Sequence, residues 1–387
     1  MSTVSTKLRL RGLDTLRSLA IVAVMSFHLQ GELPESFHAV IRFGWMGVDL
    51  FFVLSGYLIG VQLLRPCTRG ERPSLRDFYR RRAYRILPAY LVVLALYFLV
   101  PVWREQPGIS PLWQFLTFTE NLFVDYSIHQ AFSFVWSLCV EEHFYLVLPL
   151  LVLLMVRRAS IRKTSSVLAA LLLLGMATRA WALIHTLRPL GVDSYRTAYI
   201  EHIYYPTWCR LDGLLAGVTL ALIQSFRPAW WAALMQRGHV TLAGGLILFA
   251  ASIGLFWNRM SSLTGIAAWG TVVGYPLLAL SLALLVVSSV SRTGLLSRLR
   301  IPGAQTVATL AFSLYLTHKE IVHLDQRIFP NLTADQDGRA ILLYGATCLL
   351  AAASLHFAVE RPFMKLRDHR NGRTAQVAAQ MLREPAL

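Results

Sequence analysis

The sequence predicts an all-α protein, a polytopic transmembrane helical bundle with about ten crossings and both termini in the cytoplasm. Of its 387 residues, 55% are hydrophobic and 15% are charged, and its mean hydropathy is +0.51. Soluble domains carry about 25% charged residues and fewer apolar ones. This composition excludes a disordered chain, a collagen, a coiled coil and a soluble enzyme.

Apolar segments long enough to cross a bilayer, which takes about 20 helical residues, recur along the chain. We expect crossings at residues 13–30, 43–64, 86–103, 135–156, 166–187, 207–226, 240–257, 266–289, 304–323 and 340–358. The stretch 111–123 is apolar but short, so we expect a re-entrant or interfacial piece there rather than a crossing.

The basic residues between these segments predict the orientation. Of the 37 Lys and Arg residues, 26 lie in the termini and alternate connections, and 6 lie in the connections on the opposite side. The positive-inside rule therefore places both termini in the cytoplasm. The net charge of +16 is explained by inner loops that face anionic lipid, so we expect no nucleic-acid partner.

One membrane domain, residues 1–366, is expected to account for the fold. The polar remainder, residues 367–387, is too short for a core of its own and is expected to be a basic cytoplasmic tail. The four cysteines are scattered, without a CxxC pair or metal-ligand spacing, so we expect neither a disulfide framework nor a metal site.

Ionisable side chains inside a membrane are costly and therefore mark candidate functional positions. Arg17 and His28 in the first predicted helix are eleven residues apart, about 16 Å and three turns, so they face one side. Such a pair could hold an anion at one end and perform proton chemistry at the other. The alternative is that Arg17 reaches the lipid headgroups and His28 bonds a neighbouring helix.

One face of the second predicted helix carries an acidic residue and two glycines. Asp49, Phe52, Val53 and Gly56 share this face, and Gly56 with Gly60 would let another helix approach closely. The pattern mainly indicates packing, and Asp49, near the outer boundary, could simply be solvated.

An arginine tract lies where a cytoplasmic loop enters the third predicted helix. Arg81, Arg82 and Arg85 are followed by Pro88, and Arg82 and Arg85 are one helical turn apart. Guanidinium groups match phosphate oxygens bidentately, so the tract suits a phosphate-rich cytoplasmic ligand. A topology signal that binds anionic lipid is the alternative.

The fourth predicted helix opens from the outer side with WSLCVEEHFY, residues 136–145. Ser137, Glu141 and Tyr145 fall on one face, and Glu142 points about 100° away. Two carboxylates and a histidine at a helix start indicate a functional cluster, and N-terminal capping charges are the alternative.

Three further positions carry polar groups. Arg210 and Asp212, at the outer end of the sixth helix, are too close in sequence to share a helix face, so each needs a different partner. Tyr315 and His318 share a face of the ninth helix. We expect Glu360, after the tenth helix, to pair with the arginine tract or with the arginine of the first helix.

Taken in order along the chain, these motifs form a specific combination. They are Arg17-x10-His28, FFVLSG at 51–56, RRxxR at 81–85 with Pro88, WSLxVEExFY at 136–145, RLDGLLAG at 210–217, SLYLTH at 313–318 and ERP at 360–362. The combination, over about residues 11–366, resembles the membrane acyltransferase-3 family. Members of that family move an acyl group, commonly acetyl, from cytoplasmic acyl-CoA to a hydroxyl, often on a sugar.

The resemblance implies a multi-pass O-acyltransferase of the cell membrane, a bacterial cytoplasmic membrane, that acts on a glycan or glycoside. His28 and Arg17 match the family's essential histidine and arginine, and Glu141 matches its helix-start glutamate. His28 would act as general base or carry the acyl group transiently. Arg17 would hold the pantetheine arm or polarise the thioester carbonyl, and Glu141 would orient the imidazole or the acceptor.

The resemblance also implies acyl-CoA as a co-substrate, with no permanently bound cofactor. Arg82 and Arg85, helped by Arg81, match the cytoplasmic arginines that would bind its phosphates. We expect structural roles for Gly56, Pro88 and Glu360. The expected substrate-binding residues are Asp49, Ser55, Trp136, Ser137, Tyr145, Arg210, Asp212, Tyr315 and His318.

Some members carry an additional extracytoplasmic hydrolase-like domain, and this chain resembles the stand-alone form. The acceptor would then be handled directly or passed to a separate partner. The alternative function is a transporter or flippase of an acylated glycan or lipid intermediate, which would not require the arginine tract. The sequence leaves open the acyl group, the acceptor and the oligomeric state, a homo-oligomer included.

Overall fold

The computed structural model describes residues 11–156, 161–190, 192–257 and 266–369. Within these ranges the chain consists of helices and their connections, with one isolated bridge between Ile109 and Ala131, so the predicted all-α class is confirmed. The chain forms two compact units. Unit 1 comprises the chain up to Pro73 and Gln106–Ala311, and unit 2 comprises Ser74–Glu105 and the chain from Phe312 onward.

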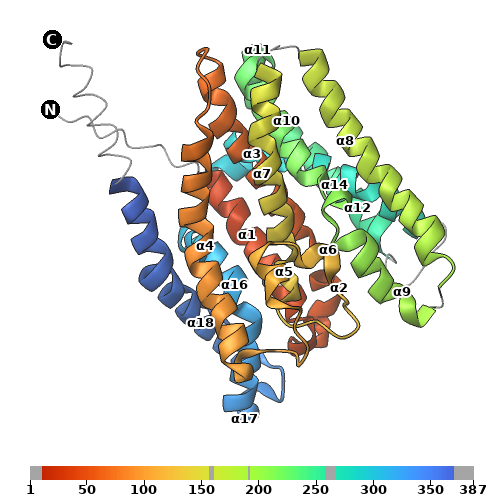
Figure 1. Cartoon of the computed structure of the whole chain (residues 1–387), viewed down its shortest axis with the longest axis vertical. Helices are drawn as coiled ribbons and strands as arrows, with labels where there is room; N and C mark the ends of the chain where they lie inside the picture. Colours follow the sequence, from red (N-terminus) through yellow and green to blue (C-terminus); the bar gives the residue numbers. More distant parts are fainter. Residues whose placement is uncertain (1–10, 157–160, 191, 258–265, 370–387) are drawn as a thin grey trace. The chain divides into compact units, whose positions relative to one another are not determined.

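Unit 1 is built from long helices joined by short ones (Figure 1). The long helices are α1 (Arg11–His28), α3 (Met46–Cys67), α7 (Trp136–Val156), α8 (Ile161–Ala182), α10 (Asp212–Phe226), α12 (Gly238–Phe256) and α14 (Tyr275–Val290). The short helices are α2 (His38–Ile41), α5 (Leu112–Leu116), α6 (Glu120–Phe123), α9 (Val192–Tyr199), α11 (Pro228–Gln236), α13 (Ile266–Trp269) and α15 (Leu295–Arg298).

Several helices of unit 1 begin or end in turns of another pitch. Wide π turns occur at η5 (Leu183–Leu187), η6 (Ile200–Tyr204) and η8 (Gly270–Gly274). Tight 3₁₀ turns occur at η1 (Gln30–Glu32), η2 (Glu35–Phe37), η4 (Ser133–Val135) and η7 (Thr207–Cys209).

Unit 2 contains α4 (Leu75–Leu99), the 3₁₀ turn η3 (Pro101–Trp103) and α16 (Ala304–Ile328) from Phe312 onward. It continues through α17 (Pro330–Thr333), α18 (Gly338–Leu355) and the π turn η9 (His356–Glu360). The chain stays helical to His369, and residues 370–387 of the predicted tail lie outside the described residues.

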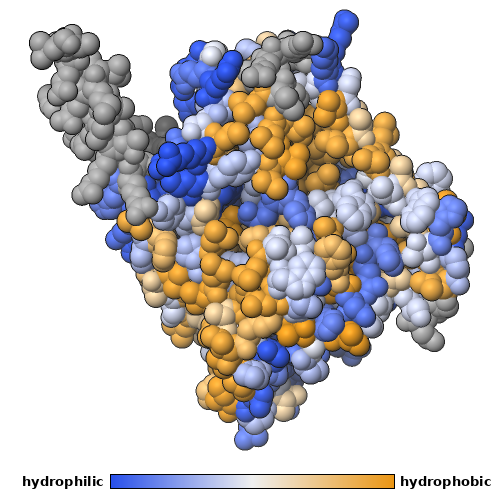
Figure 2. Space-filling model, in the orientation of Figure 1, coloured by the Kyte–Doolittle hydropathy of each residue, from blue (hydrophilic) through white to orange (hydrophobic). Residues whose placement is uncertain are grey.

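Seven helical stretches of the described chain are long and apolar enough to cross a bilayer. Apolar side chains are exposed along α7 and α8, including Leu146, Leu150, Leu173 and Trp181, as expected for surfaces that face lipid (Figure 2). A multi-pass protein is therefore established. The number of ten crossings and the side of the termini stay predictions, because α10 has only 15 residues and α1 and α16 are not among the seven stretches.

Two predicted helix starts were wrong because capping and turn chemistry decide them. The helix expected from residue 86 begins at Leu75, where the Ser74 hydroxyl accepts a hydrogen bond from the Asp77 amide at 3.3 Å. The arginine tract therefore lies on α4 and not in a loop. The helix expected from residue 207 begins at Asp212, because residues 207–209 form a 3₁₀ turn.

In unit 1, α3 packs against α10 with direct approach of the two backbones. Glycines make this approach feasible: a Cβ at Gly56 would overlap the Leu214 carbonyl oxygen, and a Cβ at Gly217 would overlap that of Val53. The neighbouring helix that Gly56 and Gly60 were predicted to contact is therefore α10. Small residues at such a crossing let backbones touch where apolar burial alone gives no preference over lipid.

Two buried ion pairs connect this helix pair to its neighbours. The Arg210 Nη2 atom lies 2.9 Å from both carboxylate oxygens of Asp49 on α3. Arg179 on α8 donates to both carboxylate oxygens of Asp212, at 2.7 and 3.0 Å. All four side chains are at most 5% exposed, so each charge is neutralised inside the protein rather than by water.

Aromatic rings enclose the Arg210 guanidinium on several sides. Its carbon lies 4.3 Å from the Tyr275 ring centroid, 4.5 Å from Tyr204 and 5.1 Å from Trp136. Cation–π attraction of this kind reaches about 2 kcal/mol in desolvated sites. The charge therefore orders the first turns of α7 and α14 as well as α3.

Replacing Gly56 with alanine is expected to disrupt the packing of α3 against α10, because the new methyl group meets backbone that cannot move alone. We expect a large fall in the melting temperature of the purified protein. Gly254→Ala in α12 is the matched control, since no atom lies within 4 Å of the added methyl group. That change removes a helical glycine and is expected to be neutral or stabilising. Equal melting temperatures for the two variants would contradict this account.

Asp49→Ala is expected to destabilise unit 1 by about 3–5 kcal/mol, because it leaves the Arg210 charge buried without its counter-ion. Asp335→Ala provides the comparison. Asp335 pairs with Arg339 at 3.4 Å, but both side chains are more than 60% exposed, and such pairs contribute about 0–1 kcal/mol. Thermal or denaturant unfolding of both variants measures the difference, and similar losses would argue against a structural role for the buried pair.

Candidate functional site

His28 is the last residue of α1 and lies against the turn that opens α7. Its ring centroid is 5.8 Å from that of Phe134 in η4, and the imidazole is half-buried. The chain enters η4 through Phe132 with φ of 59°, a left-handed conformation that is uncommon for an aromatic residue. Strained backbone of this kind persists where surrounding packing fixes it, and it clusters at functional sites. Here the Phe132 ring packs against Phe115 and Phe134.

Glu141 on α7 is held by hydroxyl groups from two helices. One of its carboxylate oxygens accepts from Ser55 on α3 at 2.8 Å, and the other accepts from the Tyr145 hydroxyl one turn away at 2.7 Å. The face shared by Glu141 and Tyr145 was predicted from their spacing. Glu141 is five residues beyond Trp136, so it lies about 7 Å along the axis from the helix start that His28 approaches.

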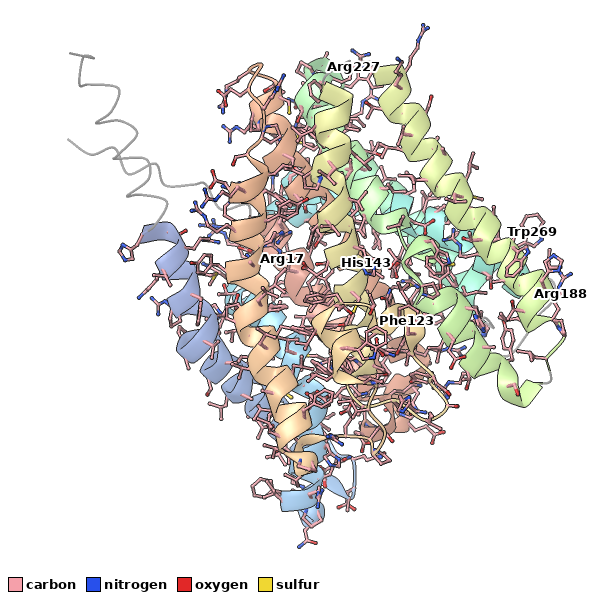
Figure 3. All side chains as sticks on the ribbon, in the orientation of Figure 1. Arg17, Phe123, His143, Arg188, Arg227 and Trp269 are labelled. Atoms are coloured by element: carbon pink, nitrogen blue, oxygen red, sulfur yellow. The ribbon has the colours of Figure 1, made fainter. Side chains whose placement is uncertain are left out.

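Two further predicted site residues lie on the same helices, Arg17 on α1 and Ser137 on α7. Arg17 projects from α1, and Figure 3 labels it together with His143 on α7. The Arg17 guanidinium is 30% exposed and lies 3.8 Å from the Asp14 carboxylate. Ser137 is buried in the first turn of α7.

Asp49, Arg210 and Asp212 are brought into the ion pairs that hold the bundle together. The prediction that Arg210 and Asp212 need different partners is confirmed, since Arg210 binds Asp49 and Asp212 binds Arg179. Trp136 stacks on Tyr205 with a centroid distance of 5.3 Å and lies against the Arg210 guanidinium. These residues therefore set the position of the α7 start.

Sequence reasoning missed Arg179, although the signal was present. Arg179 is an ionisable residue inside an apolar segment, the same pattern that singled out Arg17. It is fully buried and also donates to the carbonyl oxygens of Cys209 and Val272, at 2.6 and 3.2 Å. One guanidinium thus links α8, η7 and η8.

The other face of the α7 start carries a second polar network. His143 Nδ1 lies 2.7 Å from the Thr207 hydroxyl, which also accepts from the Asn121 amide at 2.9 Å. Next to Asn121, Glu120 is fully buried and its carboxyl oxygens have no hydrogen-bond partner among the described residues. Burial raises the pKa of Glu120 well above its ordinary value. The sequence analysis did not single out Glu120, which lies near the end of the short apolar stretch 111–123.

In unit 2, α4 carries the three predicted phosphate-binding arginines. Arg81 and Arg82 are half-buried, and Arg85 is exposed. Arg367, on the helical extension after η9, lies near enough to Arg81 for their charges to interact. Pro88 lies inside α4, which continues past it to Leu99. The structure thus adds a fourth guanidinium to this basic surface.

Tyr315 and His318 share a face of α16, as predicted, with ring centroids 6.3 Å apart. His318 is fully buried, and its Nδ1 lies 3.0 Å from the carbonyl oxygens of Leu314 and Tyr315. A donor bond from Nδ1 to these carbonyls leaves Nε2 as the acceptor nitrogen of the neutral ring.

The prediction that Glu360 pairs with the arginine tract or with Arg17 was wrong. Glu360 accepts a hydrogen bond from the Ser313 hydroxyl at 3.2 Å and lies 2.8 Å from His356 Nδ1. The physical reason is local, because residues four apart on a helical turn face each other. The side chain is buried in unit 2, where these two groups satisfy it.

Comparison with known proteins supports the resemblance. A family model described as an acyltransferase domain, that of the acyltransferase-3 family, matches residues 10–356. A peptidoglycan O-acetyltransferase, OatA, from Listeria monocytogenes is 27% identical over 374 residues, which cover 91% of this chain and 55% of that protein. The O-acetyltransferase OatA from Staphylococcus aureus is 28% identical over 227 residues, covering 55% of this chain and 34% of that protein.

The chain spans about half the length of the Listeria relative, so the similarity concerns that part of it. No solved structure matches this chain. The family model nevertheless covers every candidate site residue except Glu360. The chain belongs to the acyltransferase-3 family and is a multi-pass protein of the cell membrane.

Proposed function

We propose that this protein is a membrane O-acyltransferase that moves an acetyl group from cytoplasmic acyl-CoA to a hydroxyl of a glycan. The observation that carries the proposal is the Glu141 carboxylate, held by Ser55 and Tyr145 close to the helix start that His28 approaches. The family membership supports the reaction class.

In the proposed step, the acceptor hydroxyl oxygen attacks the thioester carbonyl carbon. A C–O bond forms, the C–S bond breaks, and the hydroxyl proton passes to neutral His28 and then to the departing CoA thiolate. Histidine suits this role because its ordinary pKa lies near physiological pH. We favour direct transfer over a stable acyl-histidine. The direct route needs one attack on a carbonyl carbon, whereas the route through acyl-histidine needs two.

Glu141 is proposed to position the acceptor. Ser55 and Tyr145 each donate a hydrogen bond to a different oxygen of Glu141, and a carboxylate offers about four acceptor positions in all. One hydroxyl of the sugar would therefore donate to Glu141 while the neighbouring hydroxyl of the same sugar reacts. Arg17 is proposed to stabilise the negative charge that develops on the thioester oxygen.

The arginines of α4 are proposed to bind the phosphates of acyl-CoA. Guanidinium groups on successive turns present several N–H donors to one side, and phosphates accept such bonds bidentately. Arg367, which pairs with Asp368 at 2.8 Å, places a further guanidinium near Arg81. Acyl-CoA is then a co-substrate that leaves as CoA after each cycle.

The acceptor is proposed to be a cell-wall glycan. The relatives from Listeria and Staphylococcus are named as O-acetyltransferases, and the Listeria protein is named for peptidoglycan. A sugar hydroxyl of that polymer fits a site that offers a carboxylate acceptor and hydroxyl groups.

His28→Ala is expected to lower the transfer rate about 10²–10⁴-fold, the usual contribution of a general base, without changing membrane insertion. The measurement follows radiolabelled acetyl groups from acetyl-CoA to peptidoglycan fragments in proteoliposomes. His185→Ala is the control, because His185 is an exposed histidine in the same unit. Full activity of a folded His28→Ala protein would refute the mechanism, and a wild-type protein that labels no acceptor would favour a flippase.

Replacing both Arg82 and Arg85 with glutamine is expected to raise the KM for acetyl-CoA at least tenfold and to change kcat less. Each charge-assisted bond to phosphate contributes about 1.5–3 kcal/mol. Arg69→Gln is the control, because Arg69 is exposed and already paired with Glu71. A KM that stays at the wild-type value in the double variant would contradict phosphate binding by these arginines.

A further inference from the structure

A cluster of acidic side chains in unit 2 has no role in the proposed reaction. The Tyr97 hydroxyl, near the end of α4, lies 2.8 Å from one oxygen of Glu105 and is also hydrogen-bonded to Glu320 on α16. Lys319 contacts the other oxygen of Glu105 at 3.1 Å. Glu105 follows η3, eight residues after Tyr97, so the cluster joins the end of α4 and the segment after η3 to α16, more than 200 residues away in the sequence.

The two hydrogen bonds between Tyr97 and the carboxyl groups need one more proton than the phenol supplies. A phenol has a single proton to donate, and an ionised carboxylate can only accept. Tyr97 therefore cannot satisfy two ionised carboxylates at once. Hydrogen bonds to both require one additional proton, carried by one of the carboxyl groups and donated to the phenol oxygen.

The surroundings decide which carboxyl group carries this proton. Glu105 has the Lys319 ammonium beside it, which stabilises its ionised form. Glu320 is fully buried, and among the described residues no Lys, Arg or His nitrogen forms an ion pair with it. Its second oxygen also has no hydrogen-bond partner in the described part of the chain. An isolated charge there would cost several kcal/mol, whereas a neutral acid avoids that cost.

We propose that unit 2 contains a buried proton-binding site in which Glu320 is a neutral carboxylic acid at pH 7. Its proton is donated to the Tyr97 oxygen, Tyr97 donates to ionised Glu105, and Glu105 pairs with Lys319. The chain of bonds runs from Lys319, which is 23% exposed, to the buried Glu320. The site goes beyond acyl transfer, since the proposed reaction releases no net proton.

Other titratable groups face the same cluster from the packed helices. His318 on α16 is buried beside Lys319, and the Cys348 thiol on α18 lies 3.7 Å from the His318 carbonyl oxygen. His323 on α16 and Arg104 are also close, and Arg104 donates to the Tyr97 carbonyl oxygen at 2.6 Å. Asp325 on α16 is a second acid close to Cys348, and the Thr347 hydroxyl donates to it at 2.6 Å. The proton on Glu320 is needed to complete the hydrogen bonds of Tyr97.

The bound proton has a structural consequence within the unit. It supplies the bond between α16 and the phenol of α4, and its loss would leave two carboxylates at a hydroxyl that can serve only one. Glutamine at position 320 reproduces the neutral donor and acceptor of the acid. The same change at position 105 removes the anion that Lys319 neutralises.

Infrared spectroscopy of the full chain, in a detergent that has no carbonyl group, tests the proposal directly. The C=O stretch of a protonated carboxyl group is separate from the bands of carboxylates. We expect the wild-type protein at pH 7 to show such a band that is lost in Glu320→Gln and retained in Glu105→Gln. Loss of a band in Glu105→Gln instead, or no difference between wild type and Glu320→Gln, would overturn the assignment.

Tyr97→Phe provides a second test that does not depend on Glu320→Gln being folded. Removing the phenol oxygen takes away the acceptor of the Glu320 proton, so the same band should shift to higher frequency while its area is kept. A spectrum in which no protonated-carboxyl band moves would show that Glu320 does not donate to Tyr97, and the proposal would be wrong.

Discussion

The helices of unit 1 are organised around a guanidinium charge that water cannot reach. Arg210 would be strongly destabilising without compensation, because burying an unpaired ion costs several kcal/mol. Asp49 supplies the opposite charge and the rings of Trp136, Tyr204 and Tyr275 supply their electron-rich faces. These groups come from α3, α7, η6 and α14, so one charge specifies how four elements meet.

The candidate site depends on this arrangement because it lies on the same helix starts. Trp136, which contacts Arg210, is the first residue of α7, and Glu141 lies little more than one turn further along. The hydroxyl of Ser55 reaches Glu141 from α3, whose register against α10 is fixed by direct backbone contact at Gly56. A carboxylate held from two helices keeps one orientation, and preorganisation of this kind lowers the barrier to a positioned reaction.

Much of the helical fold could be predicted from the sequence, because the length of an apolar segment is a local signal. The predicted segments coincide with helices, and the face shared by Glu141 and Tyr145 follows from their spacing. The predictions that failed concern features that depend on single side chains or on partners distant in the sequence. The start of α4 is decided by one serine cap, and Glu360 accepts a hydrogen bond from Ser313, 47 residues away, a partner that periodicity does not reveal. The contact of Ser55 with Glu141 joins positions 86 residues apart, beyond the reach of any spacing argument.

The π turns have a bearing on how such a bundle can change the segments next to them. Each holds one residue more than an α-helical turn, so deleting that residue would rotate everything beyond it by about 100°. The turns η5 and η6 flank α9, and η8 separates α13 from α14. Insertions and deletions of single residues in η5 or η6 would re-aim the side-chain faces of α9, a helix that carries neither Arg179 nor Arg210.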